Sequence, residues 1–174
     1  MQLLDKINSL EDLRNLDGSV LPNLADEIRQ IIIDTVSKNG GHLASNLGVV
    51  DMTIALLRVF DPAEDKILFD VSHQSYAYKI LTGRRGGFPT IRQSNGLSGF
   101  MKRTESALDV FGAGHAGTAI SAGLGFAAER DLRGGHESVV AVVGDASIAN
   151  GISLEALNNV RETTRNMIVV LNDN

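Results

Sequence analysis

A carboxylate and an amide side chain stand where a divalent cation could be held. Asp145 follows the apolar segment Val139–Val143, and Asn174 follows the apolar segment Met167–Leu171. A helix is expected between these segments, so they would run in parallel and end at the same edge of a sheet. Carboxylate and amide oxygens suit Mg²⁺, which takes its remaining ligands from phosphate and water. We therefore favour a magnesium site over a helix N-cap at Asp145 and a turn at Asn174.

A glycine-rich turn could hold a phosphate. Its sequence, Gly112-Ala-Gly114-His-Ala-Gly117, lies between a short apolar segment and a helical pattern. Such a turn presents backbone N–H groups at a helix N-terminus. The same pattern can bind a dinucleotide, but then an acidic residue should follow about 20 positions later, and Asp145 lies farther along the chain. Phosphate binding is therefore favoured over dinucleotide binding, and simple helix–strand packing is the alternative.

Three histidines are candidates for chemistry. His42 lies in a turn between two predicted helices, and His73 follows a predicted strand. An imidazole at either place could exchange protons near neutral pH, although a structural role is an equally good interpretation for an isolated histidine. His115 lies inside the glycine-rich turn, where its backbone could matter more than its ring.

The elements that would position these residues alternate in the second half of the chain. Helices are expected at Ser9–Leu16, from Pro22 to Gly40, at about 47–60, 74–81, 119–130 and 152–163. Strands are expected at Lys66–Asp70, Asp109–Phe111, Val139–Val143 and Met167–Leu171. This order predicts an α/β fold with three layers, α/β/α, around a mainly parallel sheet. The irregular stretch from Thr82 to about Ala107 is long enough to suggest a functional loop.

The composition narrows the class of protein. The chain has 174 residues, a net charge of −5 and 43% apolar residues, as expected for one globular domain covering residues 1–174. The acidic balance argues against nucleic-acid binding. No segment is apolar enough to span a membrane and no leader is recognised, so we expect a cytoplasmic protein. Because the chain stops directly after a strand at the expected ligand edge, we expect it to be a fragment of a longer one.

Several segments together resemble the 1-deoxyxylulose-5-phosphate synthase family, a group of transketolase-like thiamine-diphosphate enzymes. The matching segments follow the family's order and cover nearly the whole chain. They are Gly41-His-Leu-Ala-Ser45, Asp70-Val-Ser-His-Gln-Ser-Tyr76, Lys79-Ile-Leu-Thr-Gly-Arg-Arg85, Gly96-Leu-Ser-Gly-Phe100, Gly114-His115, Gly144-Asp145, Glu155-Ala-Leu-Asn-Asn159 and Leu171-Asn-Asp-Asn174. The Lys-Ile-Leu-Thr-Gly-Arg run distinguishes this family from ordinary transketolases.

The resemblance implies a reaction and its cofactors. The family condenses pyruvate with glyceraldehyde 3-phosphate, with loss of CO₂, to 1-deoxy-D-xylulose 5-phosphate for isoprenoid and thiamine biosynthesis. It uses thiamine diphosphate and Mg²⁺, and the resemblance implies a homodimer with the thiamine-diphosphate-binding fold.

The resemblance also assigns roles to residues of this chain. Asp145 and Asn174 would bind Mg²⁺, and Asn174 would also belong to the cofactor site. His73 would contact the cofactor, and His42 would stand near the substrate. The diphosphate would be held by Gly114, His115, Ala116, Ala146 and Ser147. The loop of residues 86–107 is expected to be mobile.

Some positions depart from the family's pattern. Ala146 stands where the family has glycine, and it would cost about 1 kcal/mol if this position required a positive φ. Ala116 and Gly117 replace hydroxyl residues, and Ser72 precedes His73 where glycine is usual. These changes leave open a degenerate, non-catalytic cofactor-binding module.

A second domain is also missing from the expected enzyme. In the family, the glutamate that activates the cofactor and the aminopyrimidine pocket lie in that domain. It must be supplied in cis or in trans, so the chain alone is expected to be inactive. One half of a split transketolase-like enzyme is therefore the other alternative.

Overall fold

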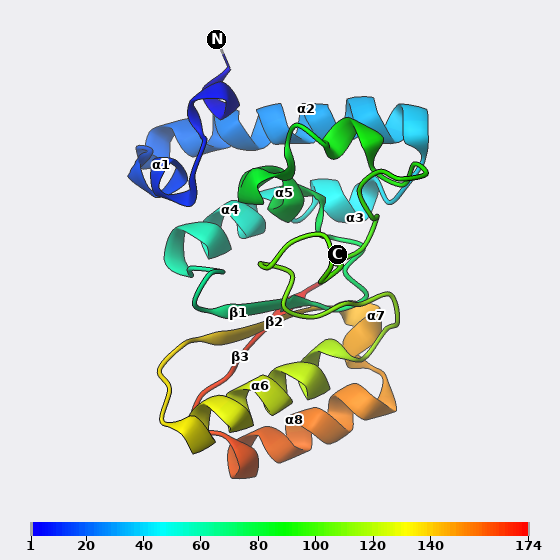
Figure 1. The fold of residues 1–174 in the computed structure, drawn as a ribbon. Helices are drawn as coiled ribbons and strands as arrows, with labels where there is room; N and C mark the ends of the chain where they lie inside the picture. Colours follow the sequence, from blue (N-terminus) through cyan, green and yellow to red (C-terminus); the bar gives the residue numbers. More distant parts are fainter. Residues whose placement is uncertain (1, 174) are drawn as a thin grey trace. The chain divides into compact units, whose positions relative to one another are not determined.

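A computed structural model describes residues 2–173, which form two compact units. The first unit comprises residues 2–60 and 74–99, and the second comprises residues 61–73 and 100–173. The first is built of helices, and the second contains a parallel sheet with its own helices (Figure 1). The polypeptide crosses from one unit to the other at residues 60–61, 73–74 and 99–100.

Two longer helices of the first unit follow the predicted apolar periodicity. Helix α2, Leu21–Asn39, has Pro22 in its first turn and ends at Gly40, whose φ is +72°. Helix α4, Val50–Val59, begins later than predicted, because the short helix α3, Ala44–Leu47, precedes it. The unit also contains the short helical segments Leu3–Lys6, α1 (Leu10–Asn15), Gly18–Val20, α5 (Tyr76–Lys79), Ile80–Arg84 and Phe88–Thr90.

The sheet of the second unit is parallel and has the order β1-β2-β3, with β2 in the centre. Its strands are β1 (Lys66–Phe69), β2 (Val139–Gly144) and β3 (Ile168–Asn172). The continuous apolar run of β2 is buried from Val139 to Val143, as is typical of a parallel strand. Gly144 pairs with Asn172, so the last residues of β2 and β3 lie side by side.

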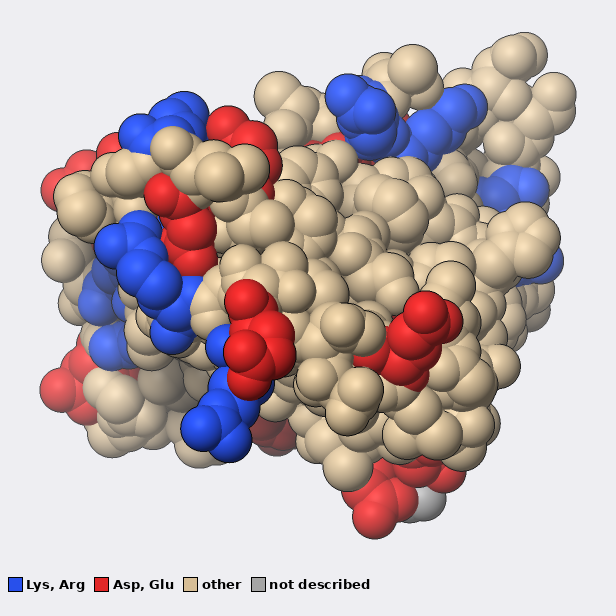
Figure 2. All heavy atoms as spheres, turned by 90° about the horizontal axis from the view of Figure 1, so that it is seen from below, with Lys and Arg blue, Asp and Glu red and all other residues tan. Residues whose placement is uncertain are grey.

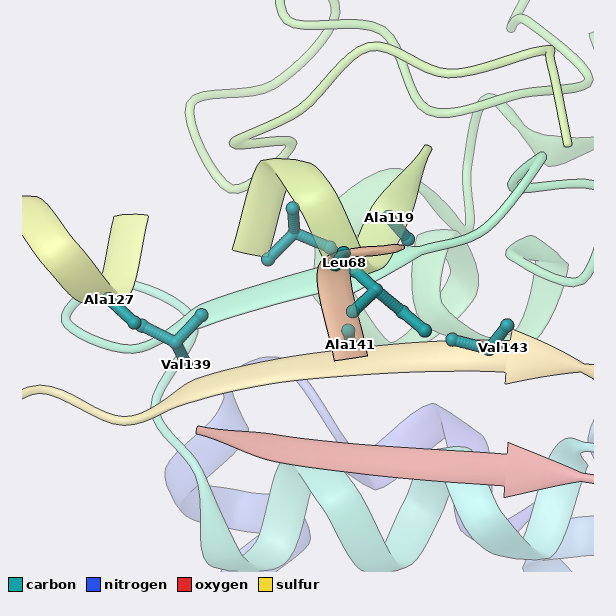
Figure 3. Close-up of a cluster of buried hydrophobic side chains, with 8 residues drawn as sticks. Leu68, Ala119, Ala127, Val139, Ala141 and Val143 are labelled. Carbon is teal, nitrogen blue, oxygen red and sulfur yellow. The ribbon is translucent and has the colours of Figure 1, made fainter. Parts of the chain in front are cut away.

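Helices of the second unit pack against this sheet through small side chains. They are α6 (Ala119–Arg133), α7 (Asp145–Ile148) and α8 (Gly151–Thr163). Alternate residues of β2 point toward α6, where Ala119 and Ala127 allow close approach (Figure 3). Leu68 of β1 belongs to the same buried cluster. The alternating βαβ order and the parallel sheet confirm the predicted α/β fold class.

The segment predicted as a strand at Asp109–Phe111 is not a strand, so this prediction was wrong. Its polar groups are used in a local turn instead. The N–H of Asp109 donates to the carbonyl of Ser106, and its carboxylate accepts the N–H of Lys102 at 2.9 Å. These bonds replace the ladder bonds that a strand would need.

The long irregular stretch is anchored at several points. Phe88, Ile91 and Met101 are buried. In the first unit, the side chain of Asn39 donates to the carbonyl oxygens of Pro89 and Ile91 at 2.9 and 3.1 Å. Residues 92–96 are exposed between these anchors, and the predicted mobility of the loop stays a prediction.

The exposed side of α6 carries charges of both signs. Arg133 forms ion pairs with Glu129 and Glu137, and Arg165 pairs with Asp131. Figure 2 shows basic and acidic side chains side by side at one end of this face. Within residues 2–173, no helix is long and apolar enough to cross a bilayer.

Candidate functional site

The carboxylate of Asp70 organises the glycine-rich turn. Asp70 follows β1 and is buried, and its two oxygens accept the N–H groups of Gly117 and Ala119, each at 2.9 Å. The side chain therefore caps the N-terminus of α6 from a neighbouring strand. These two N–H groups are thus used within the protein rather than offered to a phosphate.

The N–H groups that stay available lie earlier in the turn. Gly114, His115 and Ala116 are exposed, and their N–H groups donate to no group of residues 2–173. Gly114 has a φ of +153° and Gly117 a φ of +84°, conformations that glycine adopts without strain. A run of free N–H groups in such a turn is suited to phosphate oxygens.

Ser153 joins this turn to the segment that follows β2. Its buried hydroxyl lies 2.8 Å from the carbonyl oxygen of Ser147 and 3.3 Å from that of Gly117. A Cβ atom on Gly117 would come within 2.9 Å of side-chain atoms of both Asn150 and Ile152. The glycine-rich turn and α7 are therefore parts of one packed arrangement in the second unit.

Asp145 begins α7 directly after β2, and its side chain is exposed. Because Gly144 pairs with Asn172, the residues that follow these two strands emerge at the same edge, as predicted. Asn174, the other predicted Mg²⁺ ligand, lies outside the described residues. Among residues 2–173, no group of three or more acidic or histidine side chains could hold a metal ion. One carboxylate and a run of free backbone N–H groups in the same unit fit a cation that takes most of its ligands from a diphosphate and water.

Ala146 and Ser147 differ in exposure. Ala146 is exposed and lies within helix α7, so its φ is not positive, and the expected cost of alanine does not arise. Ser147 is 6% exposed, and its carbonyl oxygen is occupied by Ser153. A contact of Ser147 with a ligand would therefore involve its backbone N–H or its hydroxyl rather than its carbonyl.

His73 lies in a strained turn after β1. The two residues before it, Val71 and Ser72, have φ values of +56° and +66°, which side-chain-bearing residues rarely adopt. The Ser72 hydroxyl accepts the N–H of Met101 at 2.8 Å, which helps to hold this turn. Backbone strain of this kind is common at functional sites. Here it fixes the orientation of the next residue, the half-buried His73.

His42 lies in the first unit, in the turn between α2 and α3. Its carbonyl oxygen accepts a hydrogen bond from Asn46 Nδ2 at 2.6 Å. Burial lowers the pKa of His42 below its ordinary value, and the positive charge of Arg92 lowers it further. The imidazole is therefore mainly neutral at pH 7 and can accept a proton.

Arg92 was not singled out from the sequence. Its side chain passes between two glycines: a Cβ on Gly41 would lie 3.2 Å from Arg92 Cδ, and one on Gly99 would lie 3.0 Å from its Cγ. Arg92 is exposed and forms no ion pair within residues 2–173. An arginine held beside the His42 turn without a carboxylate partner is suited to an anionic ligand.

Comparison with known proteins identifies the family of the chain. Residues 4–174 match the family model described as 1-deoxy-D-xylulose-5-phosphate synthase, in the form that covers the N-terminal domain. A protein of that name from Methylacidiphilum infernorum is 58% identical over 99% of this chain and 28% of its own length. A chloroplastic 1-deoxy-D-xylulose-5-phosphate synthase 1 from Oryza sativa is 56% identical over 99% of this chain and 24% of its own length. The chain thus spans about a quarter of the length of these relatives.

A solved structure supports the fold. A mutant transketolase from Pichia stipitis superposes with a TM-score of 0.69 over 86% of this chain and 26% of that chain, at 21% identity. This likeness shows the α/β fold, and the identity to the curated relatives is much higher. The chain therefore belongs to the 1-deoxy-D-xylulose-5-phosphate synthase family and corresponds to its N-terminal domain.

Proposed function

We propose that this chain is the diphosphate-binding domain of an enzyme that condenses pyruvate with glyceraldehyde 3-phosphate. The product is 1-deoxy-D-xylulose 5-phosphate, formed with loss of CO₂, for isoprenoid and thiamine synthesis in the cytoplasm. The observation that carries the proposal is the turn of free N–H groups, Gly114–Ala116, tied through Ser153 to the segment that begins with Asp145.

Each residue of the second unit has a role in this proposal. The N–H groups of Gly114, His115 and Ala116 hold the diphosphate oxygens of thiamine diphosphate, with backbone support from Ala146 and Ser147. Asp145 and Asn174 hold Mg²⁺. His73 contacts the cofactor. Bound thiamine diphosphate supplies the carbon nucleophile and electron sink that decarboxylation of pyruvate requires.

The first unit serves the substrate in this proposal. His42, whose pKa is lowered by burial, accepts or returns a proton at the substrate oxygen. Arg92 attracts the anionic end of the substrate, which is a carboxylate in pyruvate and a phosphate in glyceraldehyde 3-phosphate. The lowered pKa of His42 and the lone charge of Arg92 support this assignment.

Calorimetric titration with thiamine diphosphate tests the proposal. The chain should bind the cofactor with Mg²⁺ and lose most of this binding with EDTA. Asp145→Ala should abolish the Mg²⁺-dependent part, whereas Glu162→Ala, which removes an exposed carboxylate from the last turn of α8, should not. Binding that is unaffected by both EDTA and Asp145→Ala would refute the metal assignment.

A second experiment concerns the missing part of the enzyme. The 174-residue chain alone should not decarboxylate pyruvate, and the complete polypeptide that carries this sequence should. If the complete polypeptide binds no cofactor, the degenerate module is the correct interpretation. If activity appears only after a second polypeptide is added, the enzyme is split.

A further inference from the structure

The hydroxyl of Tyr76 is a buried polar group that the fold does not use. Tyr76 begins α5 and is 0% exposed, and its ring meets that of Phe88 edge-on at a centroid distance of 5.7 Å. The hydroxyl oxygen is shielded from solvent and has no hydrogen-bond partner within residues 2–173. A buried hydroxyl without a partner destabilises a protein, and phenylalanine would fill the same space without this penalty. Stability alone therefore does not account for this oxygen.

This hydroxyl lies against the turn that carries His42. A Cβ atom on Gly41 would lie only 2.8 Å from the Tyr76 hydroxyl oxygen. Gly41 has a φ of +140°, so its backbone also favours glycine. The oxygen thus lies against Gly41, the residue that directly precedes His42.

The backbone of Tyr76 is tied to the same turn. The side chain of Asn46 accepts the N–H of Tyr76 at 3.0 Å and donates to the carbonyl oxygen of His42 at 2.6 Å. Asn46 is fully buried, so this connection is shielded from water. Tyr76 is therefore fixed to the His42 turn through its backbone, while its hydroxyl lies against the turn without a bond.

We propose that Tyr76 is a positioning residue for His42, whose hydroxyl forms its hydrogen bond to the Gly40–Leu43 turn when an α-keto acid binds there. The inference rests on the proposed function. The carboxylate of the substrate balances the charge of Arg92, whose side chain touches the same turn, and the turn closes onto the hydroxyl. A bond made only in the bound state strengthens substrate binding without stabilising the free protein.

Tyr76→Phe separates this role from a structural one. The variant keeps the ring, its contact with Phe88 and the N–H bond to Asn46, and it loses only the oxygen. The free protein should therefore melt at the same temperature or higher, because a buried group without a partner is removed. Substrate affinity should fall at the same time. A merely structural hydroxyl would lower the melting temperature when removed.

The experiment uses the complete polypeptide that carries this sequence, with Tyr78→Phe as the matched control on the same helix. Tyr76→Phe should raise the KM for pyruvate about tenfold, as expected for one lost hydrogen bond, and leave the Kd for thiamine diphosphate unchanged. Tyr78→Phe should leave the KM for pyruvate unchanged. An unchanged KM in Tyr76→Phe, or a lower melting temperature of its ligand-free form, would overturn the inference.

An NMR titration gives a readout that does not depend on turnover. In the complete polypeptide that carries this sequence, the imidazole signal of His42 can be assigned as the one that a His42→Gln variant lacks. Pyruvate should shift this signal in the wild type, and Tyr76→Phe should need about ten times more pyruvate for the same shift. Equal Kd values in the two proteins would refute the role of Tyr76 alone. A wild type that binds no pyruvate would refute the proposed function as well.

Discussion

The carboxylate of Asp70 lies 2.9 Å from the backbone nitrogen of Gly117, across 47 positions of the sequence. The same carboxylate accepts the N–H of Ala119, so one side chain fixes both the glycine-rich turn and the start of α6. The orientation of the exposed N–H groups before Gly117 therefore depends on a residue that no ligand needs to touch.

Asp70→Asn should weaken this arrangement. An amide accepts through one oxygen only, and its NH₂ group would face a backbone N–H donor. We expect the free energy of unfolding to fall by about 2 kcal/mol, measured by urea denaturation, together with weaker cofactor binding. Asp145→Asn, at an exposed position of the same edge, should change stability by less than about 0.5 kcal/mol. Equal losses in the two variants would contradict the capping role.

Ser72 should show two opposing effects. Ser72→Gly relieves the strain of a φ of +66° but loses the hydroxyl bond to Met101, so the two changes should nearly cancel. Ser72→Ala loses the bond and keeps the strain, and it should be about 1 kcal/mol less stable than Ser72→Gly. Chemical denaturation of both variants measures this difference, and equal stability would rule out strain at this position.

Two glycines of the second unit should respond to alanine in opposite ways. Gly117→Ala places a methyl group against Asn150 and Ile152 at a positive φ, and it should destabilise the protein by more than about 2 kcal/mol. Gly125 lies in the interior of α6 with open space around it, and Gly125→Ala should add about 0.5–1 kcal/mol. Thermal unfolding compares the two variants, and stabilisation by Gly117→Ala would show that the turn is not packed as described.

The pH dependence of stability should report on His42. Because its pKa is lowered in the folded protein, the unfolded chain binds more protons as the pH falls through the ordinary value of 6.5. The free energy of unfolding should therefore fall as the pH decreases from about 7.5 to about 5.5. His42→Gln should make this fall smaller, and His136→Gln, at an exposed position, is the control. An identical pH profile in the wild type and His42→Gln would contradict the lowered pKa.

Arg92→Gln should raise the pKa of His42 toward its ordinary value, because it removes the positive charge that disfavours the imidazolium. NMR titration of the His42 imidazole measures the change. Lys6→Gln, which removes another positive charge of the same unit, should leave this pKa where it is, because Arg92 is the charge that acts on His42. The effect of Arg92→Gln should also shrink at high salt, because Arg92 is exposed and its charge is screened.

Much of the fold could be predicted from local patterns. The apolar run at Val139–Val143 and the helix predicted at 119–130 each follow from their own residues, although the helix extends to Arg133. The position of Asp145 at a strand end follows from the order of elements. The strand predicted at Asp109–Phe111 was wrong, because the N–H of Asp109 bonds locally to the carbonyl oxygen of Ser106. Apolar character alone does not reveal such competition.

The supporting residues of the site could not be predicted in the same way. Asp70 caps a helix that lies far away in the sequence. The side chain of Arg92 occupies space that is open because Gly41 and Gly99 have no side chains. Both depend on tertiary contacts between distant segments. For Asp70, the signal in the sequence was an aspartate at the end of an apolar segment. For Arg92, it was a pair of glycines, Gly41 and Gly99, on either side of it in the sequence.

The hydroxyl of Ser153 touches the carbonyls of Gly117 and Ser147 from the first turn of α8. An anion bound in the glycine-rich turn would restrict the motion of these carbonyl groups. The N-terminal turn of α8, which is bonded to them through Ser153, would then fray less. Hydrogen–deuterium exchange of the amides at the start of α8 would then slow when the turn is occupied, while amides at its other end keep their rates. The exchange rates of these α8 amides would therefore show whether an anion is bound in the glycine-rich turn, without a catalytic assay.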